Sequence, residues 1–186
     1  HVVAMAGDGV NDDLDLGLAD LSGKLLDAAV SQNRVESLAV KTSGDYLVIV
    51  TAKRGASNYV LTIGQSLTPA NTGTQMRLSD AFVAGKAIVL FKKNAAGGLR
   101  TQAQALSLIE TRADEPDERN TLLDLATLTQ TQAYSALASP NESCFPEEFQ
   151  PDDPILRDKL ETLCRINALN LDSDVVVAAP NFIRKP

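Results

Sequence analysis

A polar stretch at residues 65–75 separates two parts of this 186-residue chain whose hydrophobic patterns differ. The stretch is rich in Ser, Thr, Pro, Asn and Gly, a composition typical of a linker. Before it, polar and apolar residues alternate with period two, as they do in half-buried strands. After it, strand and helix patterns follow one another. We therefore expect two small domains at residues 1–66 and 79–186, joined by a linker at residues 67–78.

The first part is expected to be a small antiparallel β-sandwich. Its strand-like segments recur about every ten residues and are separated by turn residues such as Ser22 and Gly23. The strongest strand pattern lies at residues 46–52, which are rich in β-branched side chains. The other strands are expected at residues 12–20, 24–30, 35–40 and 59–64.

The second part is expected to be an α+β domain with helices on one face of a sheet. Asp153 and Pro154 suit the N-cap and the first position of a helix. Pro180 is expected to end the last strand. The expected elements are strands at residues 86–91 and 175–179, helices at residues 99–111 and 154–171, and an apolar segment at residues 121–128 that fits either.

Composition argues against several classes of function. Lys and Arg number 17 and Asp and Glu 24, which gives a net charge of −7 and no basic stripe for nucleic acid. The only histidine is His1, so the chain has no His-rich zinc site and no internal base for a Ser–His–Asp site. No apolar run is long enough to span a membrane, and residues 1–5 lack the pattern of a signal peptide. Chemistry by paired carboxylates stays open, because a sequence does not show which acids converge.

A loop near the N-terminus is rich in oxygen ligands. Asp8, Asn11, Asp12 and Asp13 lie close together in the sequence, and Ca²⁺ favours loops of this kind. The spacing does not match an EF-hand. Asp and Asn also hydrogen-bond the backbone of a turn without any metal, so a calcium site and a metal-free turn both fit the sequence. No other cofactor is expected.

Two stretches resemble segments of secreted bacterial subtilisin-like serine protease precursors. The first stretch resembles strands of the pre-peptidase β-sandwich module. The matching sequences are, in this order, D-L-D-L at residues 13–16, S-G-D-Y at 43–46 and S-N-Y-V-L-T-I-G at 57–64. Residues 82–92 are similar to the start of many subtilisin pro-regions. Residues 160–169, followed by D-V-V-V-A-A-P-N-F at residues 174–182, resemble the final helix and strand of such a pro-region. The matches cover about two-thirds of the chain and leave residues 93–150 unmatched.

The chain also departs from this family pattern. One or two strands expected before residue 2 are missing from the sandwich module, so either the module is trimmed or another chain completes its sheet. The pro-region carries an acidic insertion around residues 130–150. The Asp, His and Ser motifs of a subtilisin are absent, so the resemblance implies the part of the zymogen that does not cut.

The resemblance implies a fold and a function. The fold is a partial antiparallel β-sandwich followed by a ferredoxin-like α+β propeptide domain. Pro-regions of this family act as intramolecular chaperones and protease inhibitors: their sheet packs on two helices of the protease, and their C-terminal tail enters the cleft as an added strand. The residues expected in the cleft are Asn181, Phe182, Ile183, Arg184 and Lys185. An ordinary frayed C-terminus is the alternative for this tail.

The partner implied is the subtilisin-like catalytic domain of the same precursor, and the location is secreted or periplasmic. In an exported protein Cys144 and Cys164, the two cysteines of the chain, form one disulfide or stay as two unrelated thiols. The disulfide would close a loop of about 20 residues and contribute about 3 kcal/mol. The alternative function is a secreted matrix- or surface-binding β module with an accessory α+β domain.

Overall fold

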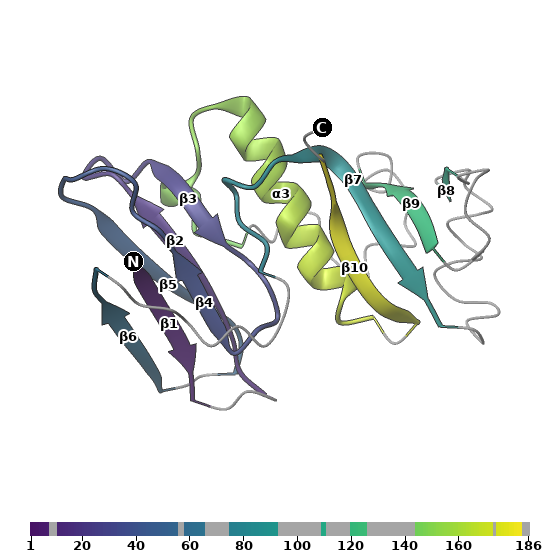
Figure 1. Ribbon diagram of the computed structural model, residues 1–186, viewed down its shortest axis with the longest axis horizontal. Coiled ribbons are helices and arrows are strands. Elements are labelled where there is room, and N and C mark those ends of the chain that lie inside the picture. The colour runs from purple at the N-terminus through teal and green to yellow at the C-terminus, as the bar shows by residue number, and fades with distance from the viewer. Residues whose placement is uncertain are drawn as a thin grey trace. The chain divides into compact units, whose positions relative to one another are not determined.

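The computed structural model describes residues 1–7, 11–55, 58–65, 75–92, 109–110, 120–125, 144–172 and 174–183. The chain divides into two compact units, His1–Asp80 with Ser143–Leu163 and Ala81–Glu142 with Cys164–Pro186. The described residues form three small antiparallel sheets and one α-helix packed against a sheet (Figure 1). The protein is therefore mostly β, with an α+β mixture of elements.

The first unit contains two three-stranded antiparallel sheets, in the strand orders β4-β1-β6 and β3-β2-β5. Their inner faces share a core of Val2, Ala4, Leu16, Leu18, Ala29 and Leu38. The antiparallel strands expected for this part are confirmed. The strands are β1 (Val2–Ala6), β2 (Asp13–Ala19), β3 (Leu25–Ala29), β4 (Val35–Leu38), β5 (Leu47–Arg54) and β6 (Tyr59–Ile63).

Strand β2 differs from the half-buried strand that its alternating pattern predicts, because every residue in it is buried. Leu16 and Leu18 belong to the core shared by the two sheets. On the other face, a Cβ added to Gly17 would lie 2.8 Å from the ring of Phe145. A segment from late in the sequence therefore covers the face on which the polar residues of β2 lie.

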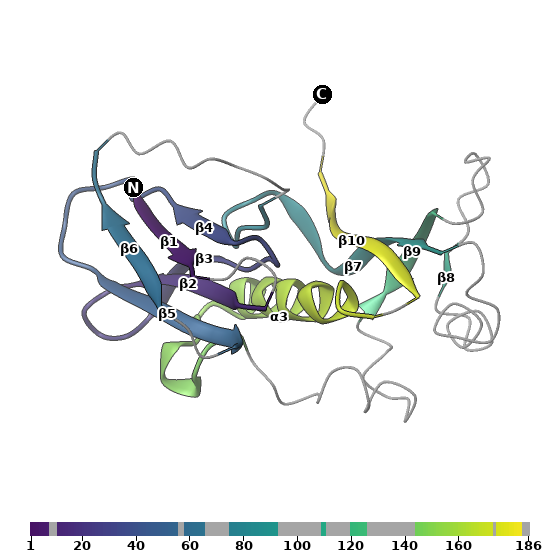
Figure 2. The same cartoon turned by 90° about the horizontal axis from the view of Figure 1, so that it is seen from below.

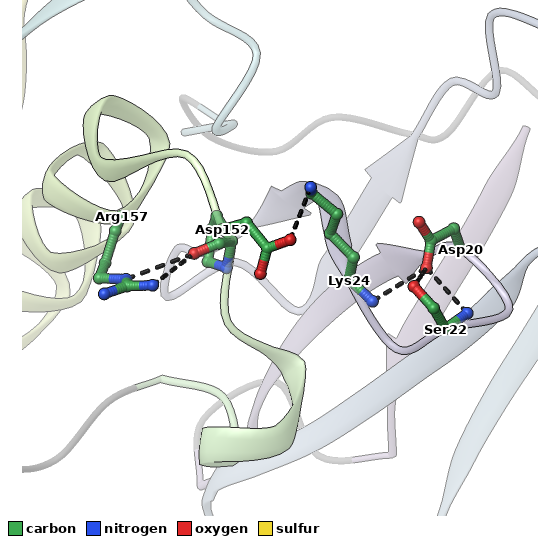
Figure 3. A network of polar contacts seen from close by, with 6 residues as sticks. Asp20, Ser22, Lys24, Asp152 and Arg157 are labelled. Atoms are coloured by element: carbon green, nitrogen blue, oxygen red, sulfur yellow. Dashed lines mark hydrogen bonds and ion pairs between the residues drawn. The ribbon is translucent and has the colours of Figure 1, made fainter.

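Polar contacts attach this late segment to the β2–β3 turn (Figure 3). The Asp20 carboxylate accepts hydrogen bonds from the Ser22 amide at 2.9 Å, the Ser22 hydroxyl at 2.6 Å and the Lys24 amide at 3.0 Å. Lys24 Nζ lies 2.7 Å from Asp152 Oδ2. Arg157 donates two hydrogen bonds, at 3.0 and 3.3 Å, to the carbonyl of the residue before Asp152. The turn predicted at Ser22 is thus present, and one ion pair joins it to the late segment at Asp152.

Residues 75–80, which include the end of the predicted linker, lie along β3. The Val30 amide donates to the Met76 carbonyl at 3.0 Å, and the Leu78 amide donates to the Ala28 carbonyl at 2.8 Å. Met76 and Leu78 are both buried. These residues therefore pack as part of the first unit.

The second unit contains a four-stranded antiparallel sheet in the order β10-β7-β9-β8. The expected strand at residues 86–91 is confirmed as part of a longer strand, and residues 121–124 of the ambiguous segment are a strand. Most of the helix expected at residues 99–111 lies outside the described residues, but at residues 109–110 the prediction is wrong, because they form a strand. The strands are β7 (Phe82–Phe91), β8 (Ile109–Glu110), β9 (Asn120–Asp124) and β10 (Val175–Phe182).

Helix α3 (Pro154–Leu169) begins where the sequence predicts. The Asp153 carboxylate accepts a hydrogen bond from the Ile155 amide at 2.8 Å, as an N-cap residue does. In the second unit Ile166 and Leu169 are buried. Just past the helix the Asn170 side chain exchanges two hydrogen bonds, at 2.6 and 3.0 Å, with the backbone of Ala178 in β10. These contacts hold the end of α3 beside the sheet (Figure 2).

Pro180 was expected to end the last strand, and this prediction is wrong. Strand β10 continues through Pro180, which lies opposite Ala87, to Phe182. Proline is tolerated here because β10 is an edge strand, where a missing amide donor need not break a ladder.

Candidate functional site

The sheet of the second unit has one buried face and one open face. Ala87, Val89 and Phe91 of β7 are fully buried, and so are Leu123 opposite Ala87 and Ala178 opposite Val89. Because side chains alternate along a strand, the residues between them lie on the opposite face. Those residues are Ile88, Leu90, Leu122, Val177 and Ala179, which we call the open face.

The open face is apolar and incompletely covered. Ile88 lies between Leu122 on β9 and Ala179 on β10, and Leu90 lies opposite Val177. Ile88, Leu90, Leu122 and Ala179 are half-buried, and Val177 is 48% exposed. The open face is thus a group of neighbouring apolar side chains that stay partly accessible to solvent.

An ion pair stands at the margin of the open face. Lys86 Nζ lies 3.1 Å from Asp124 Oδ2, and the two side chains are 25% and 30% exposed. These residues are directly opposite each other on β7 and β9. The two charges neutralise each other. The margin is therefore polar but carries no net charge that would oppose apolar packing on the open face.

The end of β10 is held against the start of β7. The rings of Phe82 and Phe182 meet edge to face, with centroids 6.5 Å apart. The Ile183 amide donates to the Ala81 carbonyl at 2.9 Å. Gly85 has φ +74°, a conformation that favours glycine, and the pairing of the two strands shifts register between Pro180 and Phe182.

The cleft-binding role expected for Asn181, Phe182, Ile183, Arg184 and Lys185 stays a prediction, but the start of this segment belongs to the sheet. Asn181 and Phe182 do not begin a free extended peptide, because they belong to β10. Ile183 follows the strand and is 55% exposed. Arg184 and Lys185 lie outside the described residues. The open face and the end of β10 belong to the same sheet.

The described residues of the predicted calcium loop contact the end of β5 or begin β2. The Asn11 carbonyl accepts a hydrogen bond from Arg54 Nε at 3.1 Å, and the Asp12 carboxylate lies against Gly55. Asp13 begins β2 and is buried, while Asp8 lies outside the described residues. Among the residues that the structure describes, no group of three or more His, Cys, Asp or Glu side chains is arranged to hold a metal. The calcium site stays a prediction.

The burial of two carboxylates of the first unit was not predicted from the sequence. Asp15 on β2 is fully buried, and neither of its carboxylate oxygens has a hydrogen-bond partner. Glu36 on β4 is 1% exposed and accepts a hydrogen bond from the Ser31 hydroxyl at Oε1, while Oε2 has none. The polar positions of alternating strands are ordinarily solvent-facing, so the sequence carried no signal for this burial.

The pKa of both carboxyls is raised well above its ordinary value. Burial is the main cause for Asp15, and the negative charges of Asp13 and Glu36 add to it, while Lys53 acts in the opposite direction. Burial is also the main cause for Glu36, against the hydrogen bond from Ser31. Burial disfavours the ionised form of a carboxyl because its charge loses contact with water.

The expected disulfide between Cys144 and Cys164 is present. Cys144 is 1% exposed and neighbours Phe145, which packs beside β2. The bond therefore holds covalently the segment that covers one face of β2.

No known protein family, curated protein or solved structure matches this chain at a significant level. In the part of the chain that the structure describes, no helix is long and apolar enough to cross a membrane.

Proposed function

We propose that this chain is the non-catalytic pro-region of a subtilisin-like serine protease, which assists folding of the protease and blocks its cleft. The observation that carries the proposal is the apolar open face on the same sheet as the C-terminal strand. The sequence motifs of this chain at residues 82–92 and 174–182 also resemble those of such pro-regions.

The strand order of the second unit supports the finer fold assignment. Numbered along the chain from β7, the strands lie in the order fourth, first, third, second, and every pair is antiparallel. This is the order of a ferredoxin-like β-α-β-β-α-β domain. Helix α3 stands between the third and fourth strands, as that pattern requires. The helix that this pattern places between the first two strands falls on residues that the structure does not describe.

The proposed mechanism has two contacts. The open face packs on the surface of the protease and removes Ile88, Leu90 and Val177 from water, which is favourable by about 25 cal/mol per Å² of apolar area. The chain after Ile183 then pairs with the substrate cleft as an added strand. Because Phe82 and Phe182 hold the end of β10, the direction in which the tail leaves is set by the folded sheet.

The disulfide supports a secreted or periplasmic location, since disulfides persist in oxidising compartments. The first unit would accompany the pro-region as a partial pre-peptidase sandwich. A direct check of the precursor is whether its reading frame continues beyond Pro186 into D-S/T-G, H-G and G-T-S-M motifs.

The main experiment measures inhibition of that catalytic domain by the purified chain. We expect competitive inhibition that weakens at least tenfold in Val177→Lys, because the substitution places a charge in the open face. Leu171→Lys is the matched control, since Leu171 is similarly exposed at 54% but lies outside the open face. Truncation after Ile183 tests the tail and leaves the Phe82–Phe182 contact in place.

Each outcome of the inhibition experiment supports or contradicts part of the proposal. Inhibition lost in the truncated chain and in Val177→Lys, but kept in Leu171→Lys, supports both proposed contacts. Equal inhibition by all four proteins would remove the open face and the tail from the mechanism. Absence of inhibition by a chain shown to be folded by circular dichroism would overturn the proposal and favour the surface-binding module.

A further inference from the structure

We propose that β6 is a self-association edge, through which two copies of this chain pair antiparallel about Leu61. Strand β6 lies at the margin of the sheet β4-β1-β6, and β1 is its only described neighbour within that sheet (Figure 1). All five of its residues are exposed. The inference is independent of the function proposed above.

The backbone of β6 presents hydrogen-bonding groups to its free edge. His1 and Gly64 exchange hydrogen bonds at 2.8 and 3.0 Å, and the Gly7 amide donates to the Asn58 carbonyl at 2.9 Å. In an antiparallel pair, hydrogen-bonded and non-bonded positions alternate. The regular register between β1 and β6 therefore turns the amides and carbonyls of residues 59, 61 and 63 away from β1.

The same three residues place apolar side chains on an uncovered inner face. Tyr59, Leu61 and Ile63 lie opposite Ala6, Ala4 and Val2, which are buried in the first unit. Residues opposite each other point to the same face of a sheet, yet these three are 49%, 39% and 70% exposed. The inner face of β6 thus has the composition of a core and the exposure of a surface.

Three of the other edge strands, β10, β4 and β5, carry features that discourage pairing, and β6 has none of them. Strand β10 contains Pro180, β4 carries the buried acid Glu36, and β5 ends in Lys53 and Arg54. Proline, inward-pointing charge and edge lysine are all devices that block edge-to-edge contact. Strand β6 reads YVLTI and pairs without a register shift.

A second copy is the occupant that the charges favour. Between Arg54 and Arg77 no residue is charged, so two chains that each carry a net charge of −7 meet here without like charges opposed. An oppositely charged partner finds no charge to pair with. The strand is also complementary to itself, because antiparallel pairing about Leu61 places Tyr59 opposite the partner's Ile63.

The register of the proposed dimer follows from the outward-facing groups. Leu61 pairs with the partner's Leu61 and Tyr59 with the partner's Ile63, which gives about six backbone hydrogen bonds. Val60 faces the partner's Thr62 at the non-bonded positions. The three inner-face side chains of each copy then form one continuous apolar strip, as in an isologous two-fold interface.

The expected dimer is weak. A strand of five residues buries less than the roughly 1,600 Å² of a standard stable interface. Sedimentation equilibrium of the full chain should therefore give an apparent mass that rises from 19.8 kDa toward twice that value as the concentration is increased.

The decisive variant is Leu61→Lys, which puts two lysines opposite each other on the two-fold axis. We expect it to stay monomeric at every concentration. Leu21→Lys is the control, because Leu21 is 68% exposed in the β2–β3 turn, and it should associate as the wild type does. Circular dichroism and a thermal melt show that both variants fold.

Hydrogen exchange provides a second readout that does not require substitution. The amides of residues 59, 61 and 63 should gain protection with rising concentration, whereas those of residues 60 and 62 are protected throughout. A chain that is monomeric up to about 1 mM overturns the proposal, as does association that Leu61→Lys leaves unchanged. Protection of residues 59, 61 and 63 in a monomer would also overturn it, because another segment of the same chain would then cover the edge.

Discussion

The ring of Phe182 stands edge to face on the ring of Phe82, with an angle of 82° between the ring planes and 6.5 Å between the centroids. Phe82 is 5% exposed and Phe182 is 39% exposed. The contact closes the end of the β7–β10 pair just beyond a shift of register. It fixes the point at which the chain leaves the sheet.

Phe182→Ala is therefore expected to loosen the last residues of β10. An edge-to-face pair contributes about 0.5–1.5 kcal/mol beyond the area that it buries, and the substitution also exposes Phe82. We expect the free energy of unfolding to fall by about 1–3 kcal/mol and the Ile183 amide to lose protection from hydrogen exchange. Ile183→Ala is the control, since that exposed side chain should cost less than about 0.5 kcal/mol.

Gly17→Ala tests the covering of β2 by the Phe145 segment. The new Cβ would lie 2.8 Å from the Phe145 ring and 3.1 Å from the side chain of Leu25, so atoms must shift to admit it. Overpacking of this kind costs about 1–3 kcal/mol, measured by urea unfolding. Combining it with Phe145→Leu, which shortens the offending side chain, should cost less than the sum of the two single changes. Strict additivity would show that Phe145 does not cover Gly17.

Local features were predictable from the sequence, and features that depend on distant contacts were not. Asp153 and Pro154 determine the start of α3 through their own backbone and side-chain properties, and the helix begins there. Pro180 was expected to end a strand, but its effect depends on whether β10 lies at an edge of the sheet. Asp15 is buried on the face of β2 that Phe145, far away in the sequence, approaches at Gly17, and no periodicity shows such a contact.

The same distinction applies to the candidate site. The residues of the open face alternate with buried ones in β7, but the sequence does not show this alternation, because residues 87–91 are all apolar. Which face stays open is decided by the side on which α3 packs, and this depends on tertiary contacts such as that between Asn170 and Ala178. Phe182 was expected at a binding surface, but its contact with Phe82 depends on the register of two strands far apart in the sequence.

Removal of the disulfide tests the anchoring of residues 144–163. We expect the double variant Cys144→Ala with Cys164→Ala to unfold with a free energy lower by about 3 kcal/mol, because the unfolded chain gains the freedom of a loop of about 20 residues. Reduction of the wild-type protein with a thiol should give a change of the same sign and similar size. Unchanged unfolding in both experiments would contradict a structural role for the bond.

The buried carboxyls make stability depend on pH in a direction opposite to that of most acids. Folding raises the pKa of Asp15 above 3.8 and that of Glu36 above 4.5, so the folded state holds these protons more tightly than the unfolded chain does. Their contribution is therefore complete below about pH 4 and is lost as the pH rises through the raised pKa values. The Asp15→Asn variant has no carboxyl at this position and should not lose this part of the stability. Its free energy of unfolding should therefore rise relative to that of the wild type as the pH increases toward 8.

Asp20→Asn is the control with the opposite sign: hydrogen bonds from Ser22 and Lys24 lower the pKa of Asp20, so its contribution disappears as the pH falls. Urea unfolding of the three proteins from pH 3 to pH 8 measures both trends, and parallel curves for Asp15→Asn and the wild type would show that Asp15 titrates as an ordinary exposed acid.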